Sequence, residues 1–117
     1  VFAEKRRRIQ AMSHIIVLMT ASTEEEADKI VRQLLTRRLI ACANTLSPVK
    51  SQYWWKGRIE ETNELLVIMK THGKLFDKLT EAIRQLHSYE VTEILALPIK
   101  SGYPPYLEWL DSVLETR

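Results

Sequence analysis

The sequence has few of the features that mark several classes of protein. It contains one cysteine, three glycines and four prolines among 117 residues, and its net charge is only +2. The single cysteine, Cys42, cannot form an internal disulfide, which favours a reducing, cytoplasmic setting. No stretch approaches the roughly 18 apolar residues that a membrane-spanning helix needs. Basic and acidic residues are interspersed, so the sequence predicts one compact domain with no membrane span and no phosphate-binding face.

Residues 1 to 12 differ in composition from the rest of the chain. They combine a basic cluster with Met12 and lack the apolar core of a signal peptide. We interpret residues 1–12 as an unstructured extension or an added tail, with Met12 as the original initiator or an alternative start. Residues 13–117 are then a single domain.

A strand followed by a helix opens this domain. The almost wholly apolar run His14–Thr20 suits a strand that is buried on both faces and central in its sheet. Ser22 and Glu25 form a capping-box pattern, which is typical of a helix start. Apolar residues then recur at helical spacing between residues 27 and 35, which predicts an amphipathic helix that ends near Arg37.

The stretch from Ala41 to Thr71 predicts one long β-hairpin. Strand-forming residues fill both arms, and Gly57 can take the positive φ angle that a tight turn needs. Its neighbour Lys56 tolerates that conformation less well, so a bulge or a longer loop is the alternative. Pro48 cannot donate a hydrogen bond to a neighbouring strand, so we expect a bulge or a bend in the first arm, or an edge there that faces something other than the chain's own next strand.

The hairpin should extend beyond the sheet to which it belongs. Arms of about a dozen residues, at ~3.4 Å per residue, are longer than the strands that flank them. Tyr53, Trp54 and Trp55 lie on the overhang, where two helices on one face of the sheet cannot cover them all. Exposed aromatic clusters are typical of interfaces or ligand sites, and strand pairing between copies of the chain would also cover the open edges. The hairpin therefore predicts self-association.

The remaining segments complete the order of elements. Apolar residues at helical spacing over residues 75–86 predict a second helix, and Val91–Ile99 predicts a last strand whose regular pairing ends at Pro98. Pro105 then opens a short C-terminal helix. The order β-α-β-β-α-β is typical of an α+β, ferredoxin-like sandwich, in which both long helices lie on one face of an antiparallel sheet. Here the sandwich has a long central hairpin.

Four separate segments carry further patterns in a fixed order. They are Ala-Cys-Ala-Asn at 41–44, Tyr-x-Trp-x-Gly-x-Ile at 53–59 followed by Glu64, the block His87-Ser-Tyr-Glu-Val-Thr-Glu93, and Tyr-Leu-x-Trp at 106–109. Together these segments resemble the CutA family of divalent-cation-tolerance proteins, from about residue 15 to the end of the chain.

The resemblance implies a cytoplasmic homotrimer in which the long hairpins extend each neighbour's sheet. It also implies similarity to the PII signalling proteins, which are trimers that bind small effectors in clefts between subunits. We therefore expect a role in tolerance of, or response to, copper and other divalent metal ions, with a metal ion or small effector at intersubunit clefts. The chain departs from the family at Ser88 and Thr92, which replace loop prolines. It also has Met19 where members proposed to bind copper carry a cysteine.

The residue chemistry and the resemblance together select candidate site residues. His87, Glu90 and Glu93 offer imidazole and carboxylate groups that can hold a divalent cation such as copper loosely. A lone histidine is weak evidence for a metal site, so a hydrogen-bonded loop histidine is the alternative. The predicted lining of the intersubunit cleft consists of Tyr53, Trp55, Glu64, Lys70, His87, Tyr89 and Glu93.

Several of these side chains also have a purely structural interpretation. Glu64 and Lys70 share strand parity, so an ion pair between them or across a subunit boundary is the alternative to a place in the cleft. His14 and His72 stand at strand ends, where we expect solvated surface groups. Cys42 lies in an apolar strand, where a thiol is usually a small core residue.

These observations bear on three classes of function. A trimeric metal-responsive or effector-binding regulator is favoured, and a trimeric scaffold that anchors or organises a partner protein without a small ligand is the alternative. An enzyme is not expected, because the sequence shows no nucleophile–base pair, oxyanion motif, phosphate loop or cofactor fingerprint. Nucleic-acid binding is also disfavoured, because the two central strands lack the aromatic residues on which this fold stacks RNA bases.

Overall fold

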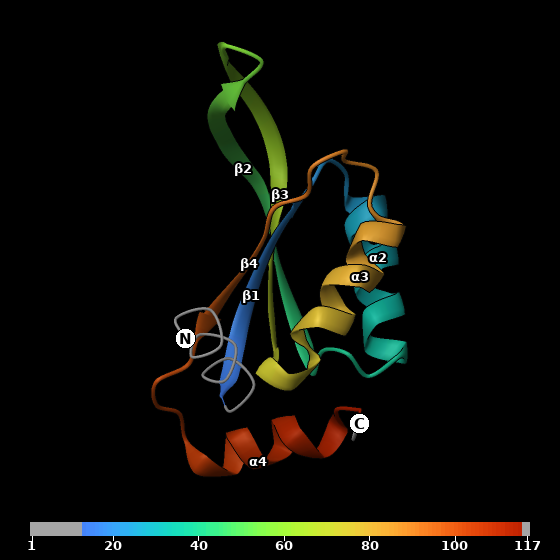
Figure 1. Cartoon of the computed structure of the whole chain (residues 1–117), viewed down its shortest axis with the longest axis vertical. Helices are drawn as coiled ribbons and strands as arrows, with labels where there is room; N and C mark the ends of the chain where they lie inside the picture. Colours follow the sequence, from blue (N-terminus) through green and yellow to red (C-terminus); the bar gives the residue numbers. More distant parts are fainter. Residues whose placement is uncertain (1–12, 116–117) are drawn as a thin grey trace, which may run out of the picture.

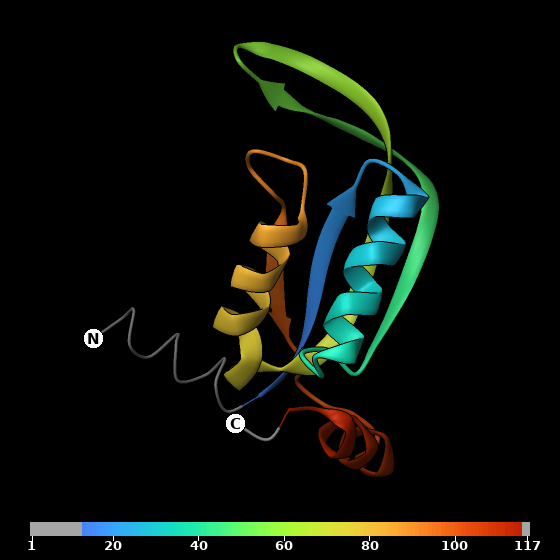
Figure 2. The same cartoon turned by 90° about the vertical axis from the view of Figure 1, so that its right-hand side faces the viewer.

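The computed structural model describes residues 13–115 and shows a two-layer α+β domain (Figure 1). One layer is a four-stranded antiparallel sheet, and the other consists of two helices on one face of that sheet (Figure 2). The predicted fold class and order of elements are confirmed. The interpretation of residues 1–12 concerns a segment outside the described residues. No helix within residues 13–115 is long and apolar enough to cross a bilayer.

The elements follow one another as predicted, with a short 3₁₀ turn before the second long helix. They are β1 (His14–Ala21), α2 (Glu24–Thr36), β2 (Cys42–Trp55), β3 (Arg58–His72), η1 (Gly73–Leu75), α3 (Phe76–Leu86), β4 (Ile94–Pro98) and α4 (Pro104–Val113). β4 is shorter than the predicted segment Val91–Ile99, because its pairing with β1 begins only at Ile94, opposite Met19.

The sheet has the strand order β2-β3-β1-β4, so β1 is an interior strand as predicted. β1 runs antiparallel to β3 from the pair His14 and His72 to the pair Ala21 and Leu65. Along most of β1, fully buried residues alternate with half-buried ones. The prediction that β1 is buried on both faces is wrong for the single chain, because α2 and α3 cover one face only (Figure 2).

The core lies between the sheet and the apolar stripes of α2 and α3. Alternate residues of β1 and β3 point into it, as the period of a β-strand requires. The fully buried members of this core include Ile15, Val17, Met19, Ile30, Leu34, Val67, Met69, Leu79 and Ile83. A second, smaller cluster joins Leu75 to Leu110 and Leu114, and it fixes α4 at the end of the sheet.

The first helix begins one residue later than the capping pattern predicted. The Thr23 hydroxyl oxygen accepts the backbone N–H of Glu26 at 3.1 Å, so Thr23 and not Ser22 is the N-cap. The reason is that β1 continues through Ala21 and moves the start of the helix along the chain. Ser22 instead donates its hydroxyl to the Glu26 carboxylate at 3.4 Å. The helix ends near its predicted position, with Arg37 as the C-cap.

The hairpin reverses direction through Lys56 and Gly57 alone, which have φ angles of 50° and 78°. Trp55 and Arg58 pair directly on either side of the turn, so the alternative of a longer loop is wrong. Positive φ at both central positions is characteristic of a type I′ turn, whose twist matches the twist of the flanking strands. The turn therefore allows both arms to stay paired to their ends.

The first arm of the hairpin contains the predicted irregularity. The register of β2 against β3 shifts between Leu46 and Val49, which confirms a bulge around Pro48. Among the described residues, the part of β3 before Leu65 pairs with β2 alone. β2 and β3 therefore continue past the rest of the sheet as a two-stranded ribbon (Figure 1). The overhang predicted from strand lengths is present.

Replacing Gly57 with alanine should lower the free energy of unfolding by about 1–2 kcal/mol, because an L-residue is strained in the left-handed region. Contacts with the rest of the protein would not contribute, since no atom beyond the adjoining residues lies within 4 Å of the added Cβ. Denaturation in guanidinium at one fixed protein concentration measures the change. Lys56→Asn is the matched control, because asparagine tolerates positive φ and should stabilise the turn. Equal stability of Gly57→Ala and the parent would contradict the turn described above.

Candidate functional site

A groove of about 690 Å³ lies where the hairpin ribbon leaves the sheet. One wall is the β2 arm of the ribbon, and the other is the loop between α3 and β4. The lining residues are Thr20, Lys50, Ser51, Gln52, Tyr53, Trp55, Glu64, Tyr89, Glu90, Val91, Thr92 and Glu93. The groove thus combines aromatic rings with several carboxylates.

Most of the predicted cleft residues line this groove. Those that do are Tyr53, Trp55, Glu64, Tyr89 and Glu93. Lys70 does not, because it lies toward the His72 end of β3, away from the groove. Its Nζ there donates to Oδ1 of Asn44. No ion pair joins Glu64 to Lys70, so the predicted pairing within one chain is wrong. His87 also lies outside the lining and is buried beside it.

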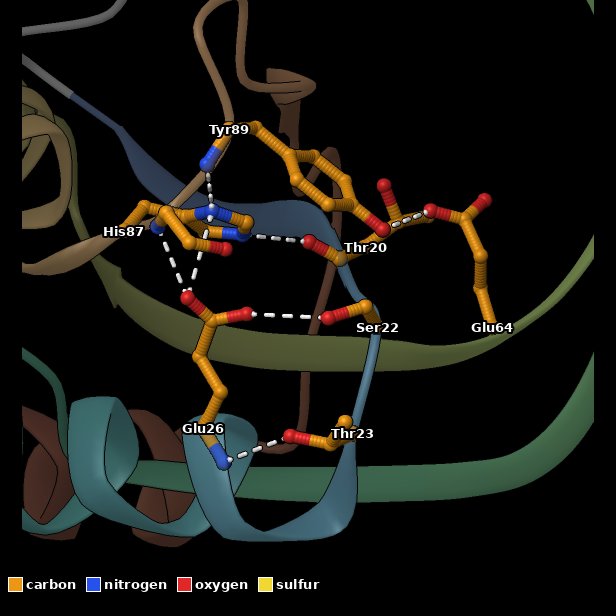
Figure 3. Close-up of polar contacts among 8 residues, drawn as sticks. Thr20, Ser22, Thr23, Glu26, Glu64, His87 and Tyr89 are labelled. Atoms are coloured by element: carbon orange, nitrogen blue, oxygen red, sulfur yellow. Dashed lines mark hydrogen bonds and ion pairs between the residues drawn. The ribbon is translucent and has the colours of Figure 1, made fainter.

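A hydrogen bond within the groove joins the loop to the hairpin. The Tyr89 hydroxyl donates to the Glu64 carboxylate at 2.5 Å (Figure 3). Glu64 is only 8% exposed, so its carboxylate depends on this donor in place of water. Burial raises the pKa of Tyr89, and the hydrogen bond and negative charge of Glu64 raise it further. Tyr89 therefore remains a donor at neutral and mildly alkaline pH.

His87 holds the backbone on either side of the groove. Its side chain is fully buried, with Nε2 at 2.7 Å from the carbonyl oxygen of Thr20 and Nδ1 at 3.1 Å from the backbone nitrogen of Tyr89. A carbonyl only accepts and an amide only donates, so we assign the proton to Nε2 and the lone pair to Nδ1. Both ring nitrogens are used within the chain, which agrees with the loop-histidine interpretation.

Glu26 supports the same loop from α2, and sequence reasoning did not identify it. Its Oε2 accepts the backbone N–H of Ser88 at 2.7 Å and lies 3.8 Å from Nδ1 of His87 (Figure 3). Burial alone would raise the pKa of Glu26, but the hydrogen bonds from Ser88 and the nearby His87 lower it. A proline at position 88 could not donate this bond, so the serine found there has a direct structural consequence.

The candidate metal ligands do not converge in one copy of the chain. Within residues 13–115, His87, Glu90 and Glu93 are not part of any group of three ligating side chains close enough to share an ion. His87 is buried, whereas Glu90 and Glu93 line the groove. The predicted metal site at these residues is therefore not formed by a single chain. Met19 is fully buried in the core, so its thioether does not face the groove.

Three other side chains meet at the opposite end of the sheet. His14 Nε2 lies 3.0 Å from Oδ1 of Asp111, and the His14 and His72 rings are in edge contact with their centroids 5.1 Å apart. Burial lowers the pKa of His72, and the neighbouring His14 lowers it further. The expectation that both histidines are solvated surface groups is wrong, because both are half-buried and have side-chain partners. Their shared position at paired strand ends is the sequence signal that could have revealed this.

Cys42 is a free thiol in a half-buried position. Its Sγ lies 3.5 Å from the hydroxyl oxygen of Tyr106 on α4. This contact raises the pKa of Tyr106, and burial raises it further. The cysteine is thus a contact between β2 and α4 and lies outside the main core.

The fold and the groove together define a ferredoxin-like protein whose central hairpin is too long for its own sheet and has a ligand-sized groove at its base. A sequence profile described as CutA1 divalent ion tolerance protein matches residues 15–113. The chain belongs to this family, as the resemblance of its separate segments predicted.

Proteins named CutA in other organisms are similar to this chain. Protein CutA of Mus musculus is 44% identical over 98 residues, which cover 84% of this chain and 55% of the mouse protein. The chain thus spans about half the length of that relative. The divalent-cation tolerance protein CutA of Thermus thermophilus is 44% identical over 95 residues, which cover 81% of this chain and 92% of the bacterial protein.

Solved structures show the same fold. CutA1 from Oryza sativa superposes with a TM-score of 0.87 at 35% identity, covering 92% of this chain and 99% of the rice chain. The periplasmic divalent cation tolerance protein CutA from Archaeoglobus fulgidus superposes with a TM-score of 0.85 at 37% identity, covering 87% of this chain and 99% of the archaeal chain.

Replacing Tyr89 with phenylalanine should lower the free energy of unfolding by about 1–3 kcal/mol at pH 7, because the buried Glu64 carboxylate loses its donor. Chemical denaturation measures the loss. Tyr103→Phe is the matched control and should have no effect, since Tyr103 is 73% exposed. Adding Glu64→Leu to Tyr89→Phe should restore part of the stability, because no buried charge is then left unpaired. Equal losses for Tyr89→Phe and Tyr103→Phe would contradict this role.

The contribution of Tyr89 should also depend on pH. A tyrosine in the unfolded chain loses its proton near its ordinary pKa of about 10, whereas folded Tyr89 keeps its proton to higher pH. The stability difference between the parent and Tyr89→Phe should therefore be constant between about pH 7 and 9 and shrink above about pH 10. Unfolding free energies measured from pH 7 to 11 test this, and a difference that grows above pH 10 would contradict it.

Proposed function

We propose that the chain forms a cytoplasmic homotrimer that serves in tolerance of, or response to, divalent metal ions such as copper. In this proposal, neighbouring copies complete the groove, which then binds a metal ion or a small effector in the manner of the PII proteins. The uncovered apolar face of the sheet, together with the overhanging ribbon, is the observation that carries the proposal. The name of the Thermus relative, divalent-cation tolerance protein CutA, supports the role in metal tolerance.

The face of the sheet opposite α2 and α3 carries many apolar side chains, and of the described helices only α4 reaches it, at one end of the sheet (Figure 1). The register places Ile16 beside Leu97, and Leu18 beside both Leu95 and Ile68. Leu95 is 54% exposed and Leu97 is 49% exposed. Exposed apolar surface of this kind is typical of an interface, and its burial contributes about 25 cal/mol per Å². A neighbouring copy packed on this face would stabilise the assembly.

The ribbon gives a second reason for association. Trp54 and Ile59 face each other across its two strands, and they are 72% and 66% exposed. A two-stranded hairpin on its own is marginally stable in water, and its outer edges carry unpaired backbone groups. Pairing with the sheet of another copy would satisfy those groups and cover both side chains.

The groove has the chemistry of a binding site that is open on one side. Tyr53 and Trp55 supply aromatic surfaces, whereas Glu90 and Glu93 supply exposed carboxylates. Carboxylates and aromatic rings both favour a positively charged ligand. A metal ion held here would need further donors from a second copy, because the described residues of one chain do not bring three ligating side chains together in the groove. A small cationic effector would be held by stacking and by the carboxylates.

The scaffold alternative is favoured by a different surface. Tyr106 and Trp109 lie against each other on α4, with ring centroids 5.5 Å apart, and both are more than 40% exposed. Exposed aromatic residues are enriched where proteins bind one another. A trimer that presents three such helices could organise a partner protein without a small ligand.

The cytoplasmic location rests on the free thiol of Cys42, which fits a reducing compartment. Fractionation of the native cells tests it, and recovery of the protein from an oxidising compartment would overturn this part of the proposal.

Sedimentation equilibrium should give about three times the protomer mass. Leu97→Arg should dissociate the assembly, because it places an unpaired charge within the apolar face. Leu35→Arg is the matched control and should leave the mass unchanged, since Leu35 is an exposed leucine on α2, away from that face. A monomeric parent, or a Leu97→Arg variant that associates as tightly as the parent, would contradict the proposal.

Native mass spectrometry of the assembly purified from its own cells should show a retained metal ion or small molecule. Glu93→Gln should reduce its occupancy, because the groove loses a carboxylate. Glu108→Gln, which alters an exposed glutamate of α4, is the control and should leave the occupancy unchanged. A trimer that retains nothing in either form would favour the scaffold over the regulator.

A further inference from the structure

Two histidines and an aspartate meet where α4 crosses the end of the sheet (Figure 1). His14 is the first residue of β1 and His72 is the last residue of β3, and the antiparallel register places them directly opposite each other. Asp111 approaches from α4, with its two carboxylate oxygens 3.0 and 3.1 Å from His14 Nε2. One ligating atom from each of the three residues lies within 4.8 Å of the other two.

We propose that His14, His72 and Asp111 bind a divalent transition-metal ion such as Zn²⁺ or Cu²⁺. Imidazole nitrogen suits zinc, copper and nickel, whereas magnesium and calcium prefer sites made entirely of oxygen. Two imidazoles and one carboxylate also leave a fourth position for water or another ligand. Cu⁺ fits less well, because none of the three side chains offers sulfur.

The spacing of two of the ligands is already close to that of a tetrahedral centre. Bonds of about 2.0–2.1 Å place two ligands of such an ion about 3.3 Å apart. His14 Nε2 and Asp111 Oδ1 lie 3.0 Å apart, with 21% and 50% of their side chains exposed to solvent. An ion entering from solvent would take the place of the Nε2 proton of His14, which would move to Nδ1 of the same ring.

His72 makes a hydrogen bond that a bound metal ion would have to break, so the loss of this bond would report binding at the site. Its Nδ1 accepts the backbone N–H of Lys74 at 3.1 Å and so caps the 3₁₀ turn that follows β3. Its proton therefore lies on Nε2. A metal ion at Nδ1 would displace the Lys74 N–H, and a metal ion at Nε2 would move the ring proton to Nδ1, opposite that N–H. Either mode of binding breaks the hydrogen bond from the Lys74 N–H to His72. Binding of the ion to other surface side chains would leave that bond intact.

The site does not depend on the proposed function of the groove. The groove reaches β1 at Thr20, near the other end of that strand. None of the three proposed ligands lines the groove. The two proposals can therefore fail separately.

Heteronuclear NMR of the full chain during titration with Zn²⁺ tests the proposal in the parent protein. The sequence has three histidines, so each imidazole can be followed separately. The His14 and His72 signals and the Lys74 amide should shift together and saturate at one ion per chain, while the His87 signals stay in place. A shift of the His87 signals instead, or no saturable shift of His14 and His72, would overturn the proposal.

Calorimetry with Zn²⁺ provides an independent test. His14→Gln and His72→Gln should each weaken binding about tenfold or more, because glutamine cannot replace an imidazole ligand. Glu108→Gln, which alters an exposed glutamate of α4 that is not one of the three ligands, is the control and should bind Zn²⁺ as tightly as the parent, and Glu93→Gln reports separately on the groove. Circular dichroism checks that each variant is folded, and the NMR titration of the parent decides the question if a variant is not. Loss of binding in Glu93→Gln, with unchanged binding in both histidine variants, would place the ion in the groove and overturn this inference alone.

Discussion

The pairing of β1 with β3 is the constraint on which the rest of the structure depends. It extends from His14 opposite His72 to Ala21 opposite Leu65. β3 has 15 residues and β1 only 8, so the excess of β3 must leave the sheet with β2 as a ribbon. The groove lies at one end of this pairing and the two histidines lie at the other. A slip of one residue would move the core residues of β1 to the open face, so the same register fixes the core and both sites.

Two carboxylates hold the loop wall of the groove from opposite sides. Glu26 on α2 accepts the backbone N–H of Ser88, and Glu64 on β3 accepts the hydroxyl of Tyr89. His87 lies between them and donates a hydrogen bond to the carbonyl oxygen of Thr20, near the end of β1. Hydrogen bonds to charged groups are among the stronger ones in proteins, so these contacts can hold an otherwise irregular segment in place. The groove therefore has one wall set by β pairing and another set by buried polar contacts.

Much of the fold could be predicted because its signals are local. Helical and strand periodicity predicted every long element. Gly57 indicated the position of the turn, and Pro48 indicated the position of the bulge. Most of the predicted groove lining also came together, because the resemblance located residues on the hairpin and on the loop after α3. The prediction of the α2 cap was wrong by one residue. The prediction that His14 is solvated was wrong because the side chain of Asp111, distant in the sequence, contacts it.

The sequence alone determined which segments become strands and helices, and that the hairpin is longer than its sheet, because these properties depend on residues near one another in the chain. Only the tertiary structure decided the partners of the polar side chains. Glu26 meets Ser88 across 62 residues, and His14 meets Asp111 across 97. Periodicity records which face of an element is apolar, but the contacts of a polar group depend on how separate elements pack together in space.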